Sequence, residues 1–497
     1  MMRLILLFFS LFALAEGTTH GRLITTPTQN GVELSWFGEG SLERADSVAG
    51  PYSAVTTESP YVASHESRFF YRVFYPNGFP TRAVGQPNIL FIILDDWGID
   101  SFDVYNSHPE ASLPPLPTLA RLADEGMVFT RAYSMPVCSP TRATIMTGRY
   151  PFRHGVGAPV SGDAVLQESE LTLPEAFIAG ESPYSLGSFG KWHLSSGRTQ
   201  LIASDPNEIG GWPTYKGGLG GGPESYFLWT KVSDGEIEEG VTDYATTVTI
   251  SDAATWIDAQ GSNPWFCWVA LNASHTPFHR PPEELHSYTG LDDEPAGAQR
   301  RPAYEAALEA ADTELARLLE SVDLSQTNII VIGDNGTPNA VVQAPFSQGH
   351  AKGSLYEGGV RVPFFITGPD VPTPGVSDAL VNCVDLFSTI LEMANLQANS
   401  LVPGGTEIDS QSLFSHLQGE PFDRAYGFAQ LFGSENDANG KAARDEQYKL
   451  IRFEESGDEF YDLLADEDEQ NNLLLGELSE ETQQRFDALS AFLDAQQ

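Results

Sequence analysis

Acidic and amide side chains follow two apolar runs that have the length and composition of buried strands. Asp95 and Asp96 come directly after the run Ile89–Leu94, and Asp334 and Asn335 end a second such run. Because functional groups gather at the carboxyl ends of the strands in a doubly wound sheet, we expect these four side chains to meet. This all-oxygen ligand set suits Ca²⁺, or Mg²⁺, rather than Zn²⁺. An Asp pair after a strand is, by itself, also typical of a turn or a helix cap.

Cys138 begins the motif Cys-Ser-Pro-Thr-Arg, which ends at Arg142 and is followed by a Thr-Gly-Arg run at 147–149. A single cysteine is most often a small buried hydrophobic residue. This motif, however, resembles the active-site motif of the formylglycine-dependent sulfatases, which belong to the alkaline phosphatase superfamily. The resemblance implies that a maturation enzyme oxidises Cys138 to an aldehyde, formylglycine. In that family the hydrated aldehyde attacks the sulfur of a sulfate ester, and one of its oxygens also binds the metal ion.

Further motifs stand in the order in which the sulfatase family has them. The first holds Lys191 and His193; the resemblance implies that Lys191 anchors the nucleophile and the sulfate and that His193 acts as the base. By the same resemblance, His275 binds the sulfate and contacts the leaving group. Lys352 would bind the sulfate and protonate the departing alcohol oxygen. Together with Arg142, the two lysines form a cluster of fixed cations of the kind that stabilises an anionic transition state.

The resemblance covers residues 86–472, and the four oxygen ligands described above match the metal site of the family. The chain departs from the family in the segment 179–184 and in the glycine-rich region 210–222. Both segments border the substrate pocket in the family, so the identity of the substrate stays open. His279, in the same loop as His275, is a weaker candidate that we place at the rim of the site.

The charge balance of the chain argues against one class of partner. Its 497 residues include 27 Lys and Arg and 68 Asp and Glu, so the formal net charge is −41. A nucleic-acid partner is therefore not expected, because binding phosphates requires cations that replace the counterions. The hydrophobic content of 41% is that of a globular protein. Cys267 and Cys383 both lie in apolar runs, and we expect two buried free thiols rather than a disulfide.

The chain divides into segments of different composition. Arg3, an apolar run and a small-x-small sequence that ends at Ala15 predict a signal peptide over residues 1–15, whose apolar run is too short to span a bilayer comfortably. The mature protein is therefore expected to be secreted or periplasmic, with no membrane span. The other expected segments are a β-rich appendage at 16–76, a Pro/Gly-rich linker at 77–86, a catalytic α/β domain at 87–402 and a C-terminal subdomain of antiparallel sheet and helix at 403–497.

The catalytic segment alternates between strand and helix patterns, which is typical of a sheet covered by helices. The run Ile89–Leu94 is continuously apolar, as in a strand buried on both faces. Residues 304–322 repeat apolar side chains at three- and four-residue spacing, which predicts a helix with one buried stripe. Ser479 caps a predicted final helix that reaches Ala495. The expected fold is α/β, with a large mixed sheet between helices as in alkaline phosphatase, a small C-terminal antiparallel sheet with a helix, and an N-terminal appendage similar to a β-sandwich.

The resemblance implies an exported sulfatase that hydrolyses sulfate esters with formylglycine and a divalent metal ion. Its expected partners are a sulfated small molecule or polysaccharide as substrate and a formylglycine-generating maturation enzyme. We favour a sulfated carbohydrate, because an exported enzyme with an accessory β domain suits the breakdown of polymers. Two alternatives stay open: a hydrolase of phosphonate or phosphate esters with similar machinery, and a non-catalytic carbohydrate-binding protein in which Cys138 is unmodified.

Overall fold

The computed structural model describes residues 86–160, 165–196, 202–434 and 438–496, together with seven short strands before residue 75. The chain forms two compact units, Met1–Gly85 and Gln86–Gln497. The signal peptide predicted at 1–15 lies outside the described residues, as does all but the last residue of the linker predicted at 77–86.

Seven short strands are described in the first unit, in the segment where the sequence predicts a β-rich appendage. The strands form two antiparallel sheets. The four-stranded sheet has the order β1 (His20–Gly21), β7 (Phe70–Phe74), β4 (Ser41–Ala45) and β5 (Ser53–Thr56), and the three-stranded sheet has the order β2 (Ile24–Thr28), β3 (Gly31–Ser35) and β6 (Tyr61–Ser64).

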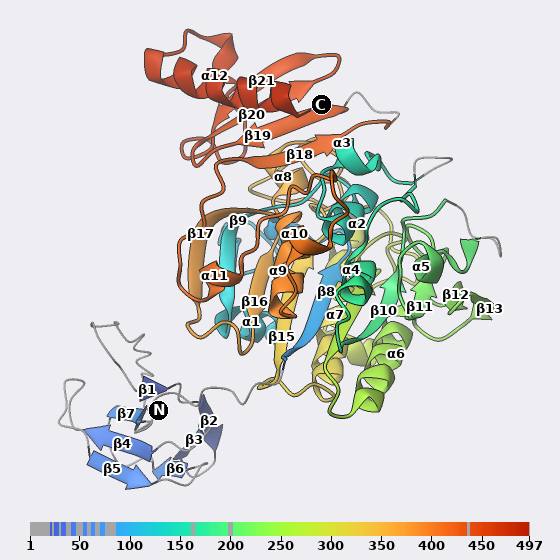
Figure 1. Cartoon of the computed structure of the whole chain (residues 1–497), viewed down its shortest axis with the longest axis vertical. Coiled ribbons are helices and arrows are strands. Elements are labelled where there is room, and N and C mark those ends of the chain that lie inside the picture. The colour runs from blue at the N-terminus through green and yellow to red at the C-terminus, as the bar shows by residue number, and fades with distance from the viewer. Residues whose placement is uncertain are drawn as a thin grey trace. The chain divides into compact units, whose positions relative to one another are not determined.

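A ten-stranded mixed sheet forms the centre of the second unit (Figure 1). Its strand order is β13 (Glu236–Val241), β12 (Trp229–Ser233), β11 (Thr214–Gly218), β10 (Ser185–Lys191), β14 (Trp265–Leu271), β8 (Asn88–Leu94), β15 (Thr327–Gly333), β16 (Phe364–Thr367), β9 (Met127–Tyr133) and β17 (Gly375–Asn382). The strands from β11 to β15 in this order run parallel. In contrast, β16 is antiparallel to both neighbours, and β12 and β13 form an antiparallel extension. The large mixed sheet predicted from the sequence is confirmed.

Strand β8 is buried on both faces and contributes to two hydrophobic cores. Ile89, Phe91 and Ile93 belong to the core that contains α2, α4 and α9. The alternate residues of the strand belong to the core that contains α1, α6 and α7. The buried stripe predicted at 304–322 lies in this second core, on α7 as far as Leu318, while Val322 follows the end of the helix at Leu319.

The helices flank the sheet on both faces, as Figure 1 shows. Their bounds are α1 (Pro117–Asp124), α2 (Cys138–Thr147), α3 (Pro151–His154), α4 (Leu173–Ala179), α5 (Asp205–Glu208), α6 (Ala245–Gln260), α7 (Arg300–Leu319), α8 (Glu357–Val360), α9 (Asp385–Met393), α10 (Ala398–Leu401), α11 (Phe414–Leu417) and α12 (Glu480–Ala495). Among the described residues, none of the helices combines the length and the hydropathy that crossing a membrane requires.

The C-terminal part contains a small antiparallel sheet with a helix against it, as predicted. The sheet has the order β18 (Gly427–Leu431), β19 (Gly440–Arg444), β20 (Tyr448–Phe453) and β21 (Gly457–Asp462). Helix α12 begins after Ser479, whose side chain accepts a hydrogen bond from the backbone N–H of Thr482, the interaction that defines an N-cap. Leu489 and Leu493 of this helix are fully buried against the sheet.

A buried charge network connects the C-terminal sheet to the α/β core. The Nζ atom of Lys449, on β20, lies 3.0 Å from Oε1 of Glu357 and 2.9 Å from Oε1 of Glu469. Tyr133 donates its hydroxyl proton to Glu357 over 2.7 Å, and Arg444 donates in turn to the hydroxyl oxygen of Tyr133. Because an unpaired buried charge is costly, this network stabilises the junction only while every member keeps its partner.

We predict that Glu469→Gln flattens the pH dependence of stability between pH 4.5 and 7. Burial, opposed by Lys449 and reinforced by Glu357, raises the pKa of Glu469 from its ordinary 4.5 to about 7. A raised carboxyl pKa contributes stability that is complete below the unfolded-state pKa and is lost as the pH rises through the folded-state pKa. The loss is on the order of 3 kcal/mol.

Urea unfolding at pH 4.5 and pH 7.5, followed by tryptophan fluorescence, measures this effect. Glu455→Gln is a matched control, because Glu455 is exposed in the turn that joins β20 and β21 of the same sheet, and this variant should follow the wild type. If Glu469→Gln lost as much stability between pH 4.5 and pH 7.5 as the wild type, the raised pKa of Glu469 would not be the cause of the pH dependence.

Candidate active site

Polar residues lie at the carboxyl ends of neighbouring parallel strands, at one edge of the large sheet. Lys191 is the last residue of β10. Asp95 and Asp96 follow β8, and Asp334 follows β15. Strand β14, which lies between β10 and β8, leads into the loop that carries His275. Since the carboxyl ends of parallel strands meet at one edge, the sheet brings these residues together as the sequence predicts.

The predicted metal ligands form one buried cluster of oxygen atoms. The backbone N–H of Asp96 donates to Oδ1 of Asp334 over 3.0 Å, and the amide of Asn335 donates to Oδ1 of Asp96 over 2.9 Å. Oδ1 of Asp95 and Oδ1 of Asn335 are buried and have no hydrogen-bond partner. A buried acceptor without a partner is unfavourable, and a bound cation would satisfy both oxygens. The residues therefore fit Ca²⁺ or Mg²⁺.

The electrostatics of the cluster also favour a cation. Burial and the neighbouring Asp334 carboxylate raise the pKa of Asp95 well above its ordinary value. A positive ion between these carboxylates would remove that repulsion. The backbone of Asp96 lies in the left-handed region with φ of 61°. For a residue other than glycine this conformation costs about 1–3 kcal/mol and is concentrated at functional sites.

Cys138 is the first residue of α2 and is only 2% exposed. Its Sγ atom lies 3.1 Å from Nδ1 of His193. One ligand atom each from Cys138, Asp95 and Asp334 lies within 4.8 Å of the others, an arrangement that could hold a metal ion. Burial alone would raise the pKa of the Cys138 thiol, but Lys191 and other nearby cations lower it below its ordinary value.

Each of the three predicted cations pairs with one of the buried carboxylates. Lys191 Nζ lies 2.5 Å from Oδ2 of Asp95. Arg142 donates to Oδ2 of Asp334 over 2.9 Å and to the carbonyl oxygen of Lys191 over 3.2 Å. Lys352 donates to Oδ1 of Asp96. The three cations and the three carboxylates thus form one buried network of ion pairs.

His275 lies at the accessible side of the site. Its Nε2 atom is 3.9 Å from Oδ2 of Asp96, and its side chain is 19% exposed. Its Nδ1 atom is 2.7 Å from the carbonyl oxygen of Thr276, which accepts if Nδ1 carries the proton. Burial lowers the pKa of His275 to about 4. At neutral pH the ring is therefore neutral, and one of its two nitrogen atoms carries a proton.

The prediction that His279 lies at the rim is wrong. The side chain is buried, and its ring stacks on Tyr226 with centroids 3.8 Å apart. Its Nε2 atom is 3.0 Å from the hydroxyl of Tyr244. The loop turns His279 inward because two tyrosines offer it an aromatic face and a hydrogen-bond partner, so its role is to support the loop.

Tyr226 is a positioning residue that the sequence analysis missed. Its hydroxyl lies 2.7 Å from the carbonyl oxygen of Asn272 and 2.8 Å from that of His275, and it donates to these two oxygens. It therefore fixes both ends of the turn that presents the His275 ring. No motif marks this tyrosine, because it comes from the segment between β11 and β12 and acts on the backbone of another loop.

The sheet and the site together define a hydrolase of the alkaline phosphatase superfamily, with a nucleophile position, a carboxylate cluster and fixed cations at one sheet edge. The family model described as Sulfatase matches residues 87–396, and the model for the C-terminal region of N-sulphoglucosamine sulphohydrolase matches residues 349–493. The chain therefore belongs to the sulfatase family, and it is a sulfuric ester hydrolase.

Named relatives are similar over most of both chains. The ulvan-active sulfatase of Formosa agariphila is 27% identical over 429 residues, which are 81% of this chain and 80% of that protein. The N-acetylgalactosamine-6-sulfatase of Homo sapiens is 28% identical over 382 residues, which are 68% of this chain and 67% of that protein. The crystal structure of Ps i-CgsB in complex with k-i-k-neocarrahexaose superposes with a TM-score of 0.68 at 22% identity, covering 83% of this chain and 94% of that chain.

We predict that Tyr226→Phe lowers kcat about tenfold with little change in KM, because the loop that carries His275 loses its hydroxyl anchor while the aromatic stacking stays. Hydrolysis of 4-nitrophenyl sulfate measures the effect. Tyr105→Phe is a matched control, since the hydroxyl of Tyr105 likewise contacts two carbonyl oxygens, those of Phe129 and Phe364, outside the site. Equal losses of kcat in both variants would contradict the positioning role.

Proposed function

We propose that the protein is an exported sulfatase that hydrolyses sulfate esters of sulfated carbohydrates, with formylglycine at position 138 and a divalent cation. The observation that carries the proposal is the convergence of Cys138, three carboxylates and three cations at one sheet edge. Sulfate is a small anion with tetrahedral oxygens, and fixed cations around it stabilise the charge that moves during ester cleavage.

The carbohydrate substrate is inferred from the relatives. One relative is named for activity on ulvan and another for N-acetylgalactosamine 6-sulfate, and the structural neighbour was crystallised with a neocarrahexaose. These names favour a sulfated sugar over the phosphonate or phosphate esters of the first alternative. Export rests on the sequence of residues 1–15 alone.

Asp95, Asp96, Asp334 and Asn335 would hold the cation, which is Ca²⁺ in our proposal with Mg²⁺ as the alternative. Their oxygens supply the ligand type that both ions prefer, and the unpartnered atoms of Asp95 and Asn335 are the strongest local support. When bound, the cation supplies positive charge that polarises the sulfate group.

The other side chains bind the ester and move protons. Once oxidised and hydrated, position 138 carries two hydroxyl groups, one of which supplies the attacking oxygen. His193, whose Nδ1 atom lies 3.1 Å from Sγ of Cys138, would accept a proton from the other hydroxyl as sulfate leaves and the aldehyde forms again. Burial, with Lys191 and Arg142 beside it, lowers the pKa of His193, so its ring is neutral and can act as a base.

Lys352 is the proton donor to the leaving alcohol oxygen. Although burial opposes it, the Asp96 carboxylate raises the pKa of Lys352 above its ordinary value, so the ammonium group carries a proton at neutral pH. Lys191 and Arg142 hold the sulfate oxygens, and His275 contacts the sulfate from the accessible side.

We predict that Cys138→Ala abolishes sulfate release, by at least three orders of magnitude, and leaves the fold intact, because the position that becomes the nucleophile is lost. Cys267→Ala is a matched control, since Cys267 is also a buried free cysteine, on β14 away from the carboxylate cluster. Mass spectrometry of the tryptic peptide that ends at Arg142 tests the modification in protein co-expressed with a maturation enzyme. An intact thiol in fully active protein would contradict the proposal.

We predict that Ca²⁺ raises the thermal unfolding temperature of protein treated with a chelator, and that Asn335→Ala shifts the midpoint of this response to at least tenfold higher Ca²⁺. A ligand that binds only the native state stabilises it by about 2.7 kcal/mol at a hundred times its Kd. Asn328→Ala is the control, because Asn328 is a buried asparagine on β15 that pairs with Asp370 instead. Identical Ca²⁺ midpoints in the two variants would exclude Asn335 as a ligand.

A further inference from the structure

The segment 350–356 carries Lys352 and contacts both the α/β core and the C-terminal part of the chain. On the core side, Nζ of Lys352 donates to the carboxylate of Asp96. On the other side, Nδ1 of His350 lies 3.3 Å from the carbonyl oxygen of Asp468, which follows β21. The proposed proton donor therefore belongs to a segment that is held from two parts of the fold.

Tyr356 connects the end of this segment to the C-terminal sheet. Its hydroxyl donates to Oε2 of Glu459, on β21, over 2.7 Å. Its ring stacks on the ring of His350, with centroids 3.7 Å apart and an angle of 9° between the planes. The ring of Tyr461, also on β21, packs edge-on at 6.2 Å. Tyr356 thus holds His350, two residues before Lys352, against the C-terminal sheet.

Helix α8 packs directly against the backbone of the same segment. A Cβ atom at Gly358 would overlap the carbonyl oxygen of His350, so only a glycine allows this approach. The helix is itself attached to the C-terminal part, because the backbone N–H of Glu357 donates to the buried carboxylate of Glu469. Closely packed groups transmit displacements, so a shift of the C-terminal sheet would move the backbone next to Lys352.

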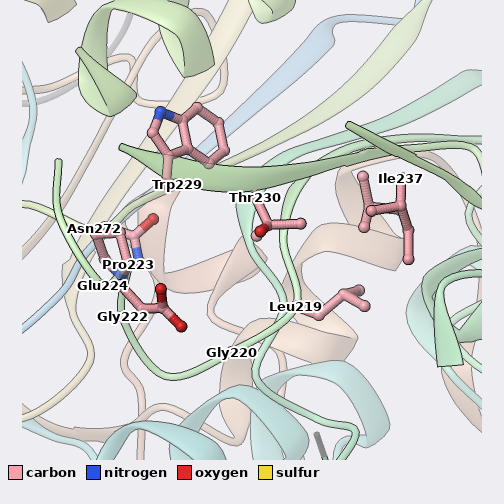
Figure 2. A pocket seen from close by; sticks show the side chains of 11 residues that line it. Leu219, Gly220, Gly222, Pro223, Glu224, Trp229, Thr230, Ile237 and Asn272 are labelled. Atoms are coloured by element: carbon pink, nitrogen blue, oxygen red, sulfur yellow. The ribbon is translucent and has the colours of Figure 1, made fainter. Parts of the chain in front are cut away.

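The two catalytic histidines have a separate support. A Cβ atom at Gly221 would lie 2.7 Å from Cε1 of His193, and one at Gly222 would lie 2.8 Å from Nδ1 of His275. Figure 2 shows this glycine-rich segment and the small pocket that it lines together with residues of β12 and β13. Both strands belong to the large sheet. A change in the C-terminal sheet is therefore expected to act on Lys352 and not on the histidines.

The position of Lys352 matters most for esters of poor leaving groups. The oxygen of a basic phenol or of an alcohol needs a proton as it departs, whereas 4-nitrophenolate is stable without one. A misplaced ammonium group therefore slows the cleavage of the first kind of ester more than that of the second. A smaller fraction of folded protein lowers both rates by the same factor, so the ratio of the two rates separates positioning from stability.

We propose that Tyr356 and Glu459 are positioning residues that hold Lys352 in place for proton transfer to the leaving oxygen. The C-terminal sheet thus takes part in the reaction through the segment that it holds, although none of the proposed catalytic side chains belongs to this sheet. The inference rests on the proposed sulfatase function and deepens it, because it assigns the C-terminal sheet a role in one chemical step.

The experiment measures kcat/KM for a series of aryl sulfates, from 4-nitrophenyl to 4-methoxyphenyl sulfate, with matured protein and Ca²⁺. This ratio covers the steps as far as the departure of the phenol and excludes later ones. Tyr356→Phe removes the hydroxyl and keeps the ring that stacks on His350. We expect kcat/KM to fall about tenfold for 4-methoxyphenyl sulfate and less than about twofold for 4-nitrophenyl sulfate.

Tyr461→Phe is the matched control. The hydroxyl of Tyr461 also donates to Oε2 of Glu459 over 2.7 Å, but this tyrosine lies on β21 and not on the segment that carries Lys352. The control should keep the wild-type dependence on the leaving group. Glu459→Ala removes the acceptor from the C-terminal side and should reproduce the effect of Tyr356→Phe. The double variant should lose no more than the larger single loss, because both substitutions break the same hydrogen bond.

An unchanged dependence on the leaving group in Tyr356→Phe and Glu459→Ala, or an equal change in Tyr461→Phe, would overturn the inference. Lys352→Gln is the reference for the proposed function, and its loss should be about a hundredfold larger for 4-methoxyphenyl than for 4-nitrophenyl sulfate. Equal losses on both esters would overturn the assignment of Lys352 as the proton donor, and the positioning role with it. The two failures are distinguishable, because the first leaves the result for Lys352→Gln intact.

Discussion

The structure depends on a balance of charge buried at the carboxyl edge of the large sheet. Three carboxylates meet three cations there, and the side chains of Asp95, Asp334, Arg142 and Lys191 are at most 1% exposed. Each buried ion loses several kcal/mol of hydration, which only close partners can restore. Two hydrophobic cores, one on each face of β8, hold the strands that keep these partners in contact. The oxygens left without a partner then define where a cation fits.

Glycine makes the close approach of these strands possible at one position in particular. Gly190 precedes Lys191 and has φ of 102°, and a Cβ atom there would lie 2.0 Å from the carbonyl oxygen of Ala270 on the neighbouring strand. Any other residue would push β10 away from β14. Lys191 and His193 follow within three residues, so their place over the carboxylate cluster depends on this contact.

The sequence predicted those parts of the site in which acidic residues directly follow a predicted buried strand. Asp95 and Asp334 end continuously apolar runs, and the geometry of a parallel sheet brings such ends together without further information. Tyr226 and the inward turn of His279 could not be predicted, because each depends on an aromatic partner from a distant segment. The same holds for the network around Lys449, whose members come from separate elements of the chain and pair only in the folded state.

A chain with a net charge of −41 repels an anionic polymer at long range, yet its site is built to hold an anion. Arg142 and Lys191 are buried, and Lys352 is 18% exposed, so their attraction for sulfate acts only once the group is inside the site. The buried cations therefore select the sulfate group inside the site and do not attract the substrate from a distance.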